Sequence, residues 1–141
     1  METLKIIKIG GNIIDNQIAL DDFLDTFSKI KGKKILVHGG GKLATQLATQ
    51  MSVPVKMIDG RRITDEVTLE IATMVYAGKI NKNMVAKLQA YQCNAIGFTG
   101  ADGNSIVSEK RPVNTVDFGF VGDVVTVHTQ TIEVLLKGNV T

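Results

Sequence analysis

The sequence predicts an α/β fold, a three-layer αβα sandwich with a largely parallel sheet. Strand-like runs alternate with segments of helical periodicity along the 141 residues. Glycine pairs follow the first two strand-like runs directly, as expected where buried strands turn into helices. The length suits one ordinary domain with a core of its own.

The first half of the chain is expected to hold three strands and two helices. Isoleucine-rich residues 4–9 and residues 34–38 read as strands, each ending at glycine. Apolar residues from Ile18 to Ile30 recur at helical spacing behind a cap at Asp15 and stop at Gly32. We therefore expect strands at 4–9, 34–38 and 55–58, a helix from about 15 to 31, and a helix from the second glycine loop to Met51.

The second half is expected to open with a long helix from Thr64 to about residue 91. Residues 67–77 are apolar nearly all round, which indicates burial on more than one side and favours a subunit interface. Another strand is expected at 94–99, a hairpin-like pair at 105–110 and 118–127, and a last helix capped by Thr129.

Composition excludes several classes of protein. No apolar run is long enough to span a bilayer, and the N-terminus lacks the pattern of a signal peptide. The net charge is only +2 and aromatic residues make up 5%, so we expect no nucleic-acid partner and no membrane partner. The single cysteine, Cys93, fits a cytoplasmic location. Asp102 and Asp123 are expected in turns, and no metal site is predicted.

Two glycine loops are the strongest chemical feature. Gly10-Gly11 follows Lys8, and Gly40-Gly41 lies in a run of three glycines after the second strand. In a parallel sheet both loops lie at the carboxyl edge, where backbone N–H groups and a helix N-terminus can hold an anion. Lys8 can add a mobile positive charge. The pair of loops favours a site for a phosphoryl group over simple tight turns.

A dinucleotide-binding Rossmann-type domain is the alternative. Gly39-x-Gly41-x-x-Ala44 follows a strand, opens a helix and is followed by Asp59. This alternative leaves the first glycine loop without a role. The phosphate-binding loop of the G-x-x-x-x-G-K-[ST] type fails, because Leu43 follows Lys42.

Arg61-Arg62 lies in a loop that leads into the long helix, and such a pair suits bidentate recognition of a carboxylate. A solvated basic turn is the competing interpretation. His38 is better explained as a packed histidine at the end of a strand than as a catalytic base, because no partner for it is evident.

Five motifs, taken in order, resemble the amino-acid kinase superfamily and, within it, the N-acetylglutamate kinases. They are Lys8-Ile9-Gly10-Gly11-Asn12, Val37-His38-Gly39-Gly40-Gly41, Gly60-Arg61-Arg62-Ile63-Thr64-Asp65, Gly78-Lys79-Ile80-Asn81-Lys82 and Gly119-Phe120-Val121-Gly122-Asp123. The resemblance runs from about Leu4 to the last residue.

The resemblance implies ATP-dependent phosphorylation of the γ-carboxylate of an N-acylglutamate, a step of arginine biosynthesis. Lys8 would stabilise the moving phosphoryl group. Backbone N–H groups of Gly11, Gly40 and Gly41 would hold that group and the γ-carboxylate, with Gly10 in the same phosphate-binding loop. Arg62 would bind the α-carboxylate. Phosphoryl transfer needs positioning and charge stabilisation more than a general base, which agrees with the residues present.

The resemblance also sets expectations for the chain as a whole. Residues 1–141 would be an N-terminal acylglutamate-binding domain, homodimeric through the helix that starts near Thr64. The lobe that binds ATP with Mg²⁺, the cosubstrate, would be absent, so this chain alone would bind no cofactor tightly and show no turnover. A non-catalytic sensing domain on the same fold is the other alternative. Arg61 stands where relatives usually have an apolar residue, which leaves the acyl group open between acetyl and succinyl. Either Arg61 pairs with the distal carboxylate of a succinyl group, or it points into solvent and only its backbone matters.

Overall fold

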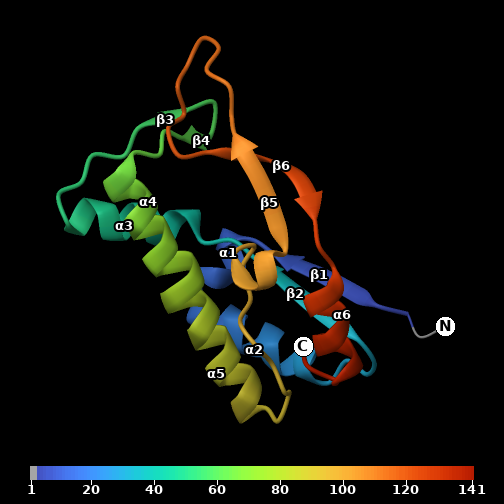
Figure 1. Ribbon diagram of the computed structural model, residues 1–141. Coiled ribbons are helices and arrows are strands. Elements are labelled where there is room, and N and C mark those ends of the chain that lie inside the picture. Colours follow the sequence, from blue (N-terminus) through green and yellow to red (C-terminus); the bar gives the residue numbers. More distant parts are fainter. Residues whose placement is uncertain (1–2) are drawn as a thin grey trace.

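The computed structural model describes residues 3–141, and its centre is a pair of parallel strands (Figure 1). β1 (Lys5–Ile9) pairs with β2 (Lys34–His38) in a register that sets Ile9 opposite His38. The short helix α1 (Gly11–Ile14) follows β1 immediately, and α2 (Gln17–Ser28) returns the chain to the start of β2. The two predicted strands and their parallel relation are confirmed.

The N-terminal cap of α2 lies one residue later than predicted. Asn16, not Asp15, accepts the hydrogen bond from the backbone N–H of Ala19. Asp15 is instead the C-terminal capping residue of α1, and its backbone N–H donates to the carbonyl of Gly11 in the glycine loop. One face of α2 buries Leu20, Leu24 and Phe27 against the sheet. The spacing of these three residues follows the helical repeat, which is why the sequence predicted the helix correctly.

Lys34, the first residue of β2, is buried and closes the C-terminal end of α2. Its Nζ donates to the backbone carbonyls of Phe27, Ser28 and Ile30 at 2.9, 2.8 and 2.8 Å. The last carbonyls of a helix lack partners within the helix, and a cation at that end also interacts favourably with the helix dipole. Lys34 thus fixes the helix on the strand that follows it.

The predicted third strand at 55–58 does not extend the parallel sheet. After α3 (Gly41–Gln50), only β3 (Met57–Ile58) is a strand, and it pairs antiparallel with β4 (Arg61–Arg62). Asp59 and Gly60 form the turn, both with positive φ (48° and 75°). An Asp-Gly pair favours this type of tight hairpin. The turn therefore converts the expected parallel strand into one arm of a small ribbon.

The predicted long helix is present as three segments in line: α4 (Glu66–Thr73), a π-helical segment (Met74–Ile80) and α5 (Asn81–Ala90). Its cap is Asp65 rather than Thr64, since the Asp65 carboxylate accepts from the backbone N–H of Thr68 at 2.8 Å. Thr68, Ile71 and Val75 are buried, whereas the opposite side of the first segments is exposed.

Residues 94–99, predicted as a strand, have no regular secondary structure. A 3₁₀ turn (Asp102–Asn104) leads into the hairpin of β5 (Ile106–Lys110) and β6 (Gly122–Val127), which confirms the predicted pair. Helix α6 (Gln130–Lys137) is the last helix along the sequence. Thr129 precedes it, and its hydroxyl donates to Glu133 instead of capping a backbone N–H.

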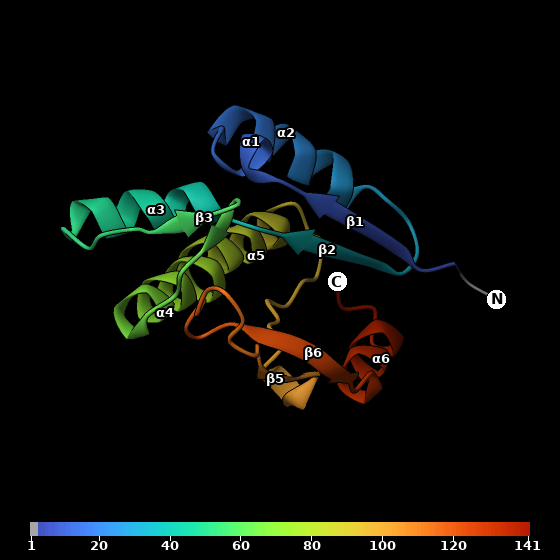
Figure 2. The ribbon, with the colours of Figure 1, turned by 90° about the horizontal axis from the view of Figure 1, so that it is seen from above.

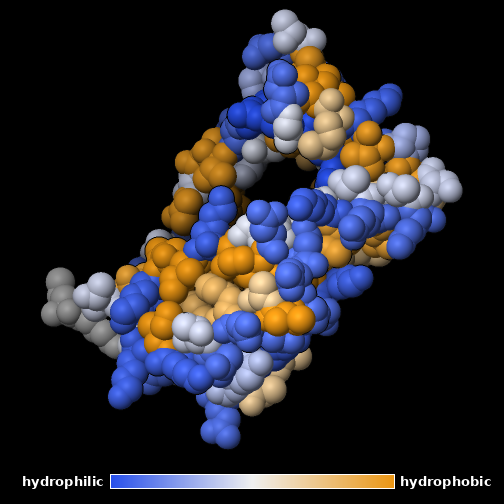
Figure 3. All heavy atoms as spheres, turned by 180° about the vertical axis from the view of Figure 1, so that it is seen from behind, coloured by the Kyte–Doolittle hydropathy of each residue, from blue (hydrophilic) through white to orange (hydrophobic). Residues whose placement is uncertain are grey.

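The elements form layers around β1 and β2 (Figure 2). Helices α1 and α2 lie on one side of the two strands, and the β5–β6 hairpin and α6 lie on the other. Seen from behind, hydrophobic residues lie along the arm formed by the hairpin, and the molecule is hollowed beneath it (Figure 3). Among residues 3–141, no helix has the length and apolar character to cross a membrane.

Candidate active site

The two glycine loops leave the sheet side by side. Because Ile9 and His38 are opposite each other in adjacent parallel strands, Gly10-Gly11 and Gly39–Gly41 emerge at the same carboxyl edge. Lys42, in the first turn of α3, contacts Asn12 Oδ1 at 3.3 Å and Asp15 Oδ2 at 3.5 Å. This lysine ties the helix after the second loop to the helix after the first. The structure thus brings the two predicted loops together.

The second loop is covered by the π-helical segment. A Cβ built on Gly40 would lie 2.2 Å from Ile80 Cδ1 and 3.1 Å from the ring of Tyr76. The Tyr76 hydroxyl comes within ordinary contact of a Cβ on Gly41. Only glycine fits at position 40. The wider π-helical turn is a form that recurs at functional sites, and here it places Tyr76 and Ile80 against the loop.

Arg62 is anchored beside the second loop. Its Nη2 donates to the carbonyl of Gly41 at 3.0 Å and to Thr45 Oγ1 at 2.7 Å. Its Nε is buried, and no described residue accepts a hydrogen bond from it. A buried guanidinium N–H without an acceptor is uncommon and leaves one donor available for an anion. Arg62, expected in a loop, thus lies in the short strand β4, and its side chain reaches Gly41.

Arg61 faces the other way. Successive side chains of a strand point to opposite faces, so Arg61 leaves β4 on the side away from Arg62. It is exposed, and its charge acts on Asp123 of β6. The pKa of Asp123 is lowered first by its hydrogen bonds with Arg111, and the charge of Arg61 lowers it further. Arg61 thus lies near the hairpin, apart from the contacts that hold Arg62 on α3.

Lys8 extends from β1 toward solvent, two residues before Gly10 of the first glycine loop. Its neighbours Ile7 and Ile9 turn inward, and Ile9 is buried in the core. In the described part of the chain, no hydrogen bond or ion pair holds the Lys8 ammonium group. A lysine with this freedom can follow a charge that moves during a reaction.

His38 has a partner that sequence reasoning missed. Asn81 Nδ2 lies 3.3 Å from His38 Nε2, and His38 Nδ1 lies 3.0 Å from the carbonyl of Gly39. With the Asn81 amide in this orientation, Nδ2 donates to Nε2 in the tautomer whose ring proton is on Nδ1 and points at Gly39. With both nitrogens engaged, His38 orients the loop and is not a free base. The sequence motif that contains Asn81 was the available signal, but Asn81 and His38 are 43 residues apart in the sequence.

Together these residues place backbone N–H groups of two loops, one anchored arginine and one exposed lysine at the same edge of the sheet. Such an edge can orient a carboxylate and a phosphoryl group and stabilise their charge. Among the described residues, no group of histidine, cysteine and carboxylate side chains could hold a metal ion. The dinucleotide-binding alternative loses its support, because Asp59 lies in the β3–β4 turn instead of at the end of a parallel strand.

The chain belongs to the amino acid kinase family, whose pattern matches residues 3–141. Curated relatives of this chain are acetylglutamate kinases. The protein of that name from Cytophaga hutchinsonii is 58% identical over 142 residues, which span all of this chain and 54% of the relative. The one from Phocaeicola vulgatus is 54% identical over 96% of this chain and 53% of its own length. The chain thus spans about half the length of the curated relatives it matches.

Solved structures agree on the fold. The smu.665 protein of Streptococcus mutans superposes with a TM-score of 0.76 at 22% identity, over 97% of this chain and 56% of that one. N-acetylglutamate synthase from Neisseria gonorrhoeae, in complex with coenzyme A and N-acetylglutamate, gives 0.75 at 19% identity, over 98% of this chain and 32% of that one. At these identities the likeness establishes the amino-acid kinase fold and nothing finer.

Proposed function

We propose that this chain is the acylglutamate-binding part of an enzyme that phosphorylates the γ-carboxylate of an N-acylated glutamate with ATP and Mg²⁺, in arginine biosynthesis. The observation that carries this proposal is the position of Arg62. It lies against Gly41 with a free buried N–H, at the edge where both glycine loops emerge. The similarity to acetylglutamate kinases supports it.

In this proposal the two ends of the substrate are held by different groups. Arg62 binds the α-carboxylate, while N–H groups of Gly11, Gly40 and Gly41 hold the γ-carboxylate and the phosphoryl oxygens. Lys8 stabilises the charge of the phosphoryl group as it passes from ATP to the carboxylate. ATP with Mg²⁺ supplies the phosphoryl group. The residues that bind the nucleotide belong to the second half that the relatives possess, so residues 1–141 alone give no turnover.

The roles can be separated in a chimaera of this chain and the second half of the Cytophaga hutchinsonii relative. Lys8→Ala should lower kcat roughly a hundred- to a thousandfold, the usual loss of one donor aimed at developing charge, with little change in KM. Arg62→Ala should raise KM for the acylglutamate roughly ten- to a hundredfold, the equivalent of a charge-assisted hydrogen bond. KM for ATP should change much less.

Thr45→Val is the matched control for Arg62. It removes one anchor of the guanidinium and keeps the charge, so its effect on KM should be much smaller than that of Arg62→Ala. An unchanged kcat in Lys8→Ala would refute its catalytic role, and equal increases in both KM values would refute the role of Arg62. A coupled ADP assay tests the chain alone. Turnover above background would contradict the proposal that residues 1–141 need the second half of the relatives for activity.

The acyl group is a finer part of the proposal. An acetyl group carries no charge, whereas a succinyl group ends in a carboxylate that Arg61 could bind. Arg61 is exposed, and its charge already acts on Asp123. We expect a preference for N-succinylglutamate that Arg61→Leu abolishes, measured as the ratio of kcat/KM for the two substrates. A preference for the acetyl substrate, or one that survives Arg61→Leu, removes Arg61 as the selector.

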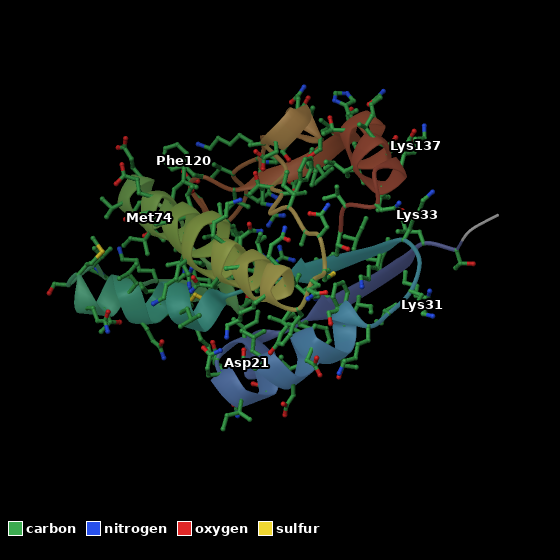
Figure 4. All side chains as sticks on the ribbon, turned by 90° about the horizontal axis from the view of Figure 1, so that it is seen from below. Asp21, Lys31, Lys33, Met74, Phe120 and Lys137 are labelled. Carbon is green, nitrogen blue, oxygen red and sulfur yellow. The ribbon has the colours of Figure 1, made fainter. Side chains whose placement is uncertain are left out.

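We further propose that two copies associate through α4. This helix buries Thr68 and Ile71 on one side and exposes Val67, Leu69 and, just beyond it, Met74. Figure 4 shows Met74 and the exposed Phe120 at the same end of the molecule. Val67→Asp should shift the mass in light scattering from dimer to monomer, and Ile18→Asp on α2 should leave it unchanged. A monomeric parent chain contradicts this interface.

A sensing domain that binds acylglutamate without turnover is the competing function. The free Nε of Arg62 favours substrate binding in both cases. The chimaera distinguishes them, because a sensing domain binds acylglutamate in calorimetry yet produces no ADP.

A further inference from the structure

The proposed reaction assigns no role to residues 78–82, although they lie against the second glycine loop. Ile80 ends the π-helical segment, and a Cβ on Gly40 would collide with it. Asn81 begins α5, and its amide reaches the ring of His38, the last residue of β2. The loop between β2 and α3 is therefore contacted both along its chain and at the strand residue that precedes it.

The π-helical geometry brings these contacts onto one face of the long helix. The backbone N–H of Asn81 bonds to the carbonyl of Tyr76, five residues earlier, which is the spacing that defines a π-helix. In a regular α-helix, a residue five positions on lies about 140° round the axis from the first. The wider turn reduces this angle, so Tyr76 and Asn81 line the same cavity together with His38.

The amide of Asn81 is held in place by its surroundings. The residue is only 8% exposed, and its Nδ2 lies 3.3 Å from His38 Nε2. Its Oδ1 lies so close to Gly97 that a Cβ there would collide with it, and no described residue donates a hydrogen bond to this oxygen. Within the described part of the chain, the contact with His38 is thus the one hydrogen bond that this amide makes.

His38 carries this contact to the loop through the following peptide unit. Its Nδ1 lies 3.0 Å from the carbonyl oxygen of Gly39. A neutral ring that accepts at Nε2 from Asn81 carries its proton on Nδ1 and donates it to this carbonyl, whereas the other neutral tautomer would oppose two acceptors there. The Gly39 carbonyl and the N–H of Gly40 belong to one planar peptide unit. Holding the carbonyl therefore fixes the direction of the Gly40 N–H.

We propose that Asn81 is a positioning residue for the reaction. Its amide selects the tautomer of His38 that holds the Gly39 carbonyl, and this bond aims the N–H of Gly40 at the γ-carboxylate of the substrate. Asn81 does not contact the substrate and acts through His38. The inference rests on the proposed function, because it concerns one of the N–H groups that hold the substrate there. Replacement of Asn81 should change the position of the ring proton first, and the loop and the reaction as a consequence.

The tautomer is measured in the 141-residue chain by the imidazole nitrogen chemical shifts at about pH 8, where an ordinary histidine is neutral. The chain has two histidines, so His128→Gln assigns the signals of His38. The parent should carry the proton on Nδ1. Asn81→Leu should populate the Nε2–H form and shift the amide resonance of Gly40. Lys82→Met, the matched control, removes a hydrogen bond from the next residue to a different segment and should change neither.

The effect on the reaction is measured in the chimaera that tests the proposed function. Asn81→Leu should lower kcat/KM for the acylglutamate roughly tenfold or more, because a small misplacement of a group that holds the substrate slows the reaction strongly. KM for ATP should change little, and Lys82→Met should match the parent.

Asn81→Asp keeps the shape of the residue and replaces its N–H₂ donor by a carboxylate, so it separates positioning through His38 from packing. A carboxylate at position 81 accepts only from a protonated Nε2, so both contacts of His38 then require the imidazolium form. The kcat/KM of this variant, relative to that of the parent, should fall as the pH rises from about 6 to about 9. Tyr76 and Lys82 are the titratable side chains next to this pair, and both are present in the two proteins, so the ratio reports His38.

An Nε2–H or a doubly protonated ring in the parent overturns the proposal. Equal effects of Asn81→Leu and Lys82→Met overturn it too, as does an activity ratio for Asn81→Asp that does not vary with pH. A parent chimaera without turnover refutes the proposed function instead. In that case the tautomer and the Gly40 resonance in the 141-residue chain decide whether Asn81 positions the loop.

Discussion

The β1–β2 pair and the β5–β6 hairpin are both strand pairs that carry several apolar residues, yet they are stabilised differently. Ile9 of β1 is buried in the core formed with Leu24 and Phe27 of α2. Every residue of β6 is exposed, and only Val107 in β5 is partly covered. The first pair is held by a core, and the second by its own ladder and a few contacts at its ends.

The hairpin is attached to the body near the candidate active site. Thr64, which precedes α4, bridges Gly119 and exchanges backbone hydrogen bonds with Phe118 and Phe120 at 2.9 and 2.7 Å. Arg111 and Asp123 pair across the arms. An element attached by so few contacts opens at low free energy. The difference indicates that the β1–β2 pair is a rigid platform for the glycine loops and that the hairpin opens more easily than this platform.

The core substitution Leu24→Ala should have the largest effect on stability. Leu24 is fully buried, and removing such a side chain costs about 2–5 kcal/mol through lost transfer energy and the cavity left behind. Val125→Ala in β6, at a 51% exposed position, should stay within about 0.5 kcal/mol. Urea unfolding measures both. Similar losses for the two would show that the hairpin is packed in solution.

Gly119→Ala should detach the hairpin. Gly119 has a φ of 74°, and a Cβ there would lie 2.2 Å from the carbonyl oxygen of Thr64. Gly60→Ala is the matched control: its φ is 75°, and nothing lies near its Cβ, so it meets only the left-handed strain of about 1–2 kcal/mol. Exchange of the amides of Thr64 and Phe120 should accelerate more in Gly119→Ala. Equal acceleration in both variants would exclude a steric attachment.

Lys34→Met should lower the free energy of unfolding by about 1–3 kcal/mol, because one buried and two partly buried hydrogen bonds to the carbonyls of Phe27, Ser28 and Ile30 are lost. Lys29→Met, which removes an exposed lysine one turn from Asp25, is the control and should change the free energy of unfolding little. If Lys34→Met is as stable as the parent, the apolar replacement compensates for the lost hydrogen bonds.

The smallest effect concerns pH. Hydrogen bonds from Thr68 lower the pKa of Asp65 below its ordinary value of 3.8. A carboxyl group with a lowered pKa stabilises the folded state above its unfolded pKa, and this contribution is lost as the pH falls through the folded pKa. The Tm of the parent should exceed that of Asp65→Asn near pH 6, and the difference should vanish near pH 2. A difference that is constant with pH would mean that ionisation of Asp65 does not matter.

Local patterns predicted most elements and the loops of the site. Glycines after strands located both loops, and the helical repeat located α2, because these signals reside in neighbouring residues. The interpretation of residues 55–58 as a parallel strand was wrong. Asp59-Gly60 favours a local turn, and a strand of two residues is too short to show an alternation of apolar and polar residues. The Asn81–His38 contact could not be predicted, since nothing in either segment specifies the other.

The sequence by itself determined the α/β class, the paired glycine loops, Lys8 before the first of them and the two arginines before the long helix. These properties depend on backbone conformation and spacing within a few residues. Only the tertiary structure decided that Arg62 turns onto α3 while Arg61 turns toward the hairpin, and that Asn81 reaches His38. Such relations depend on how separate elements pack, and packing is settled by the summed burial of distant side chains instead of by any local preference.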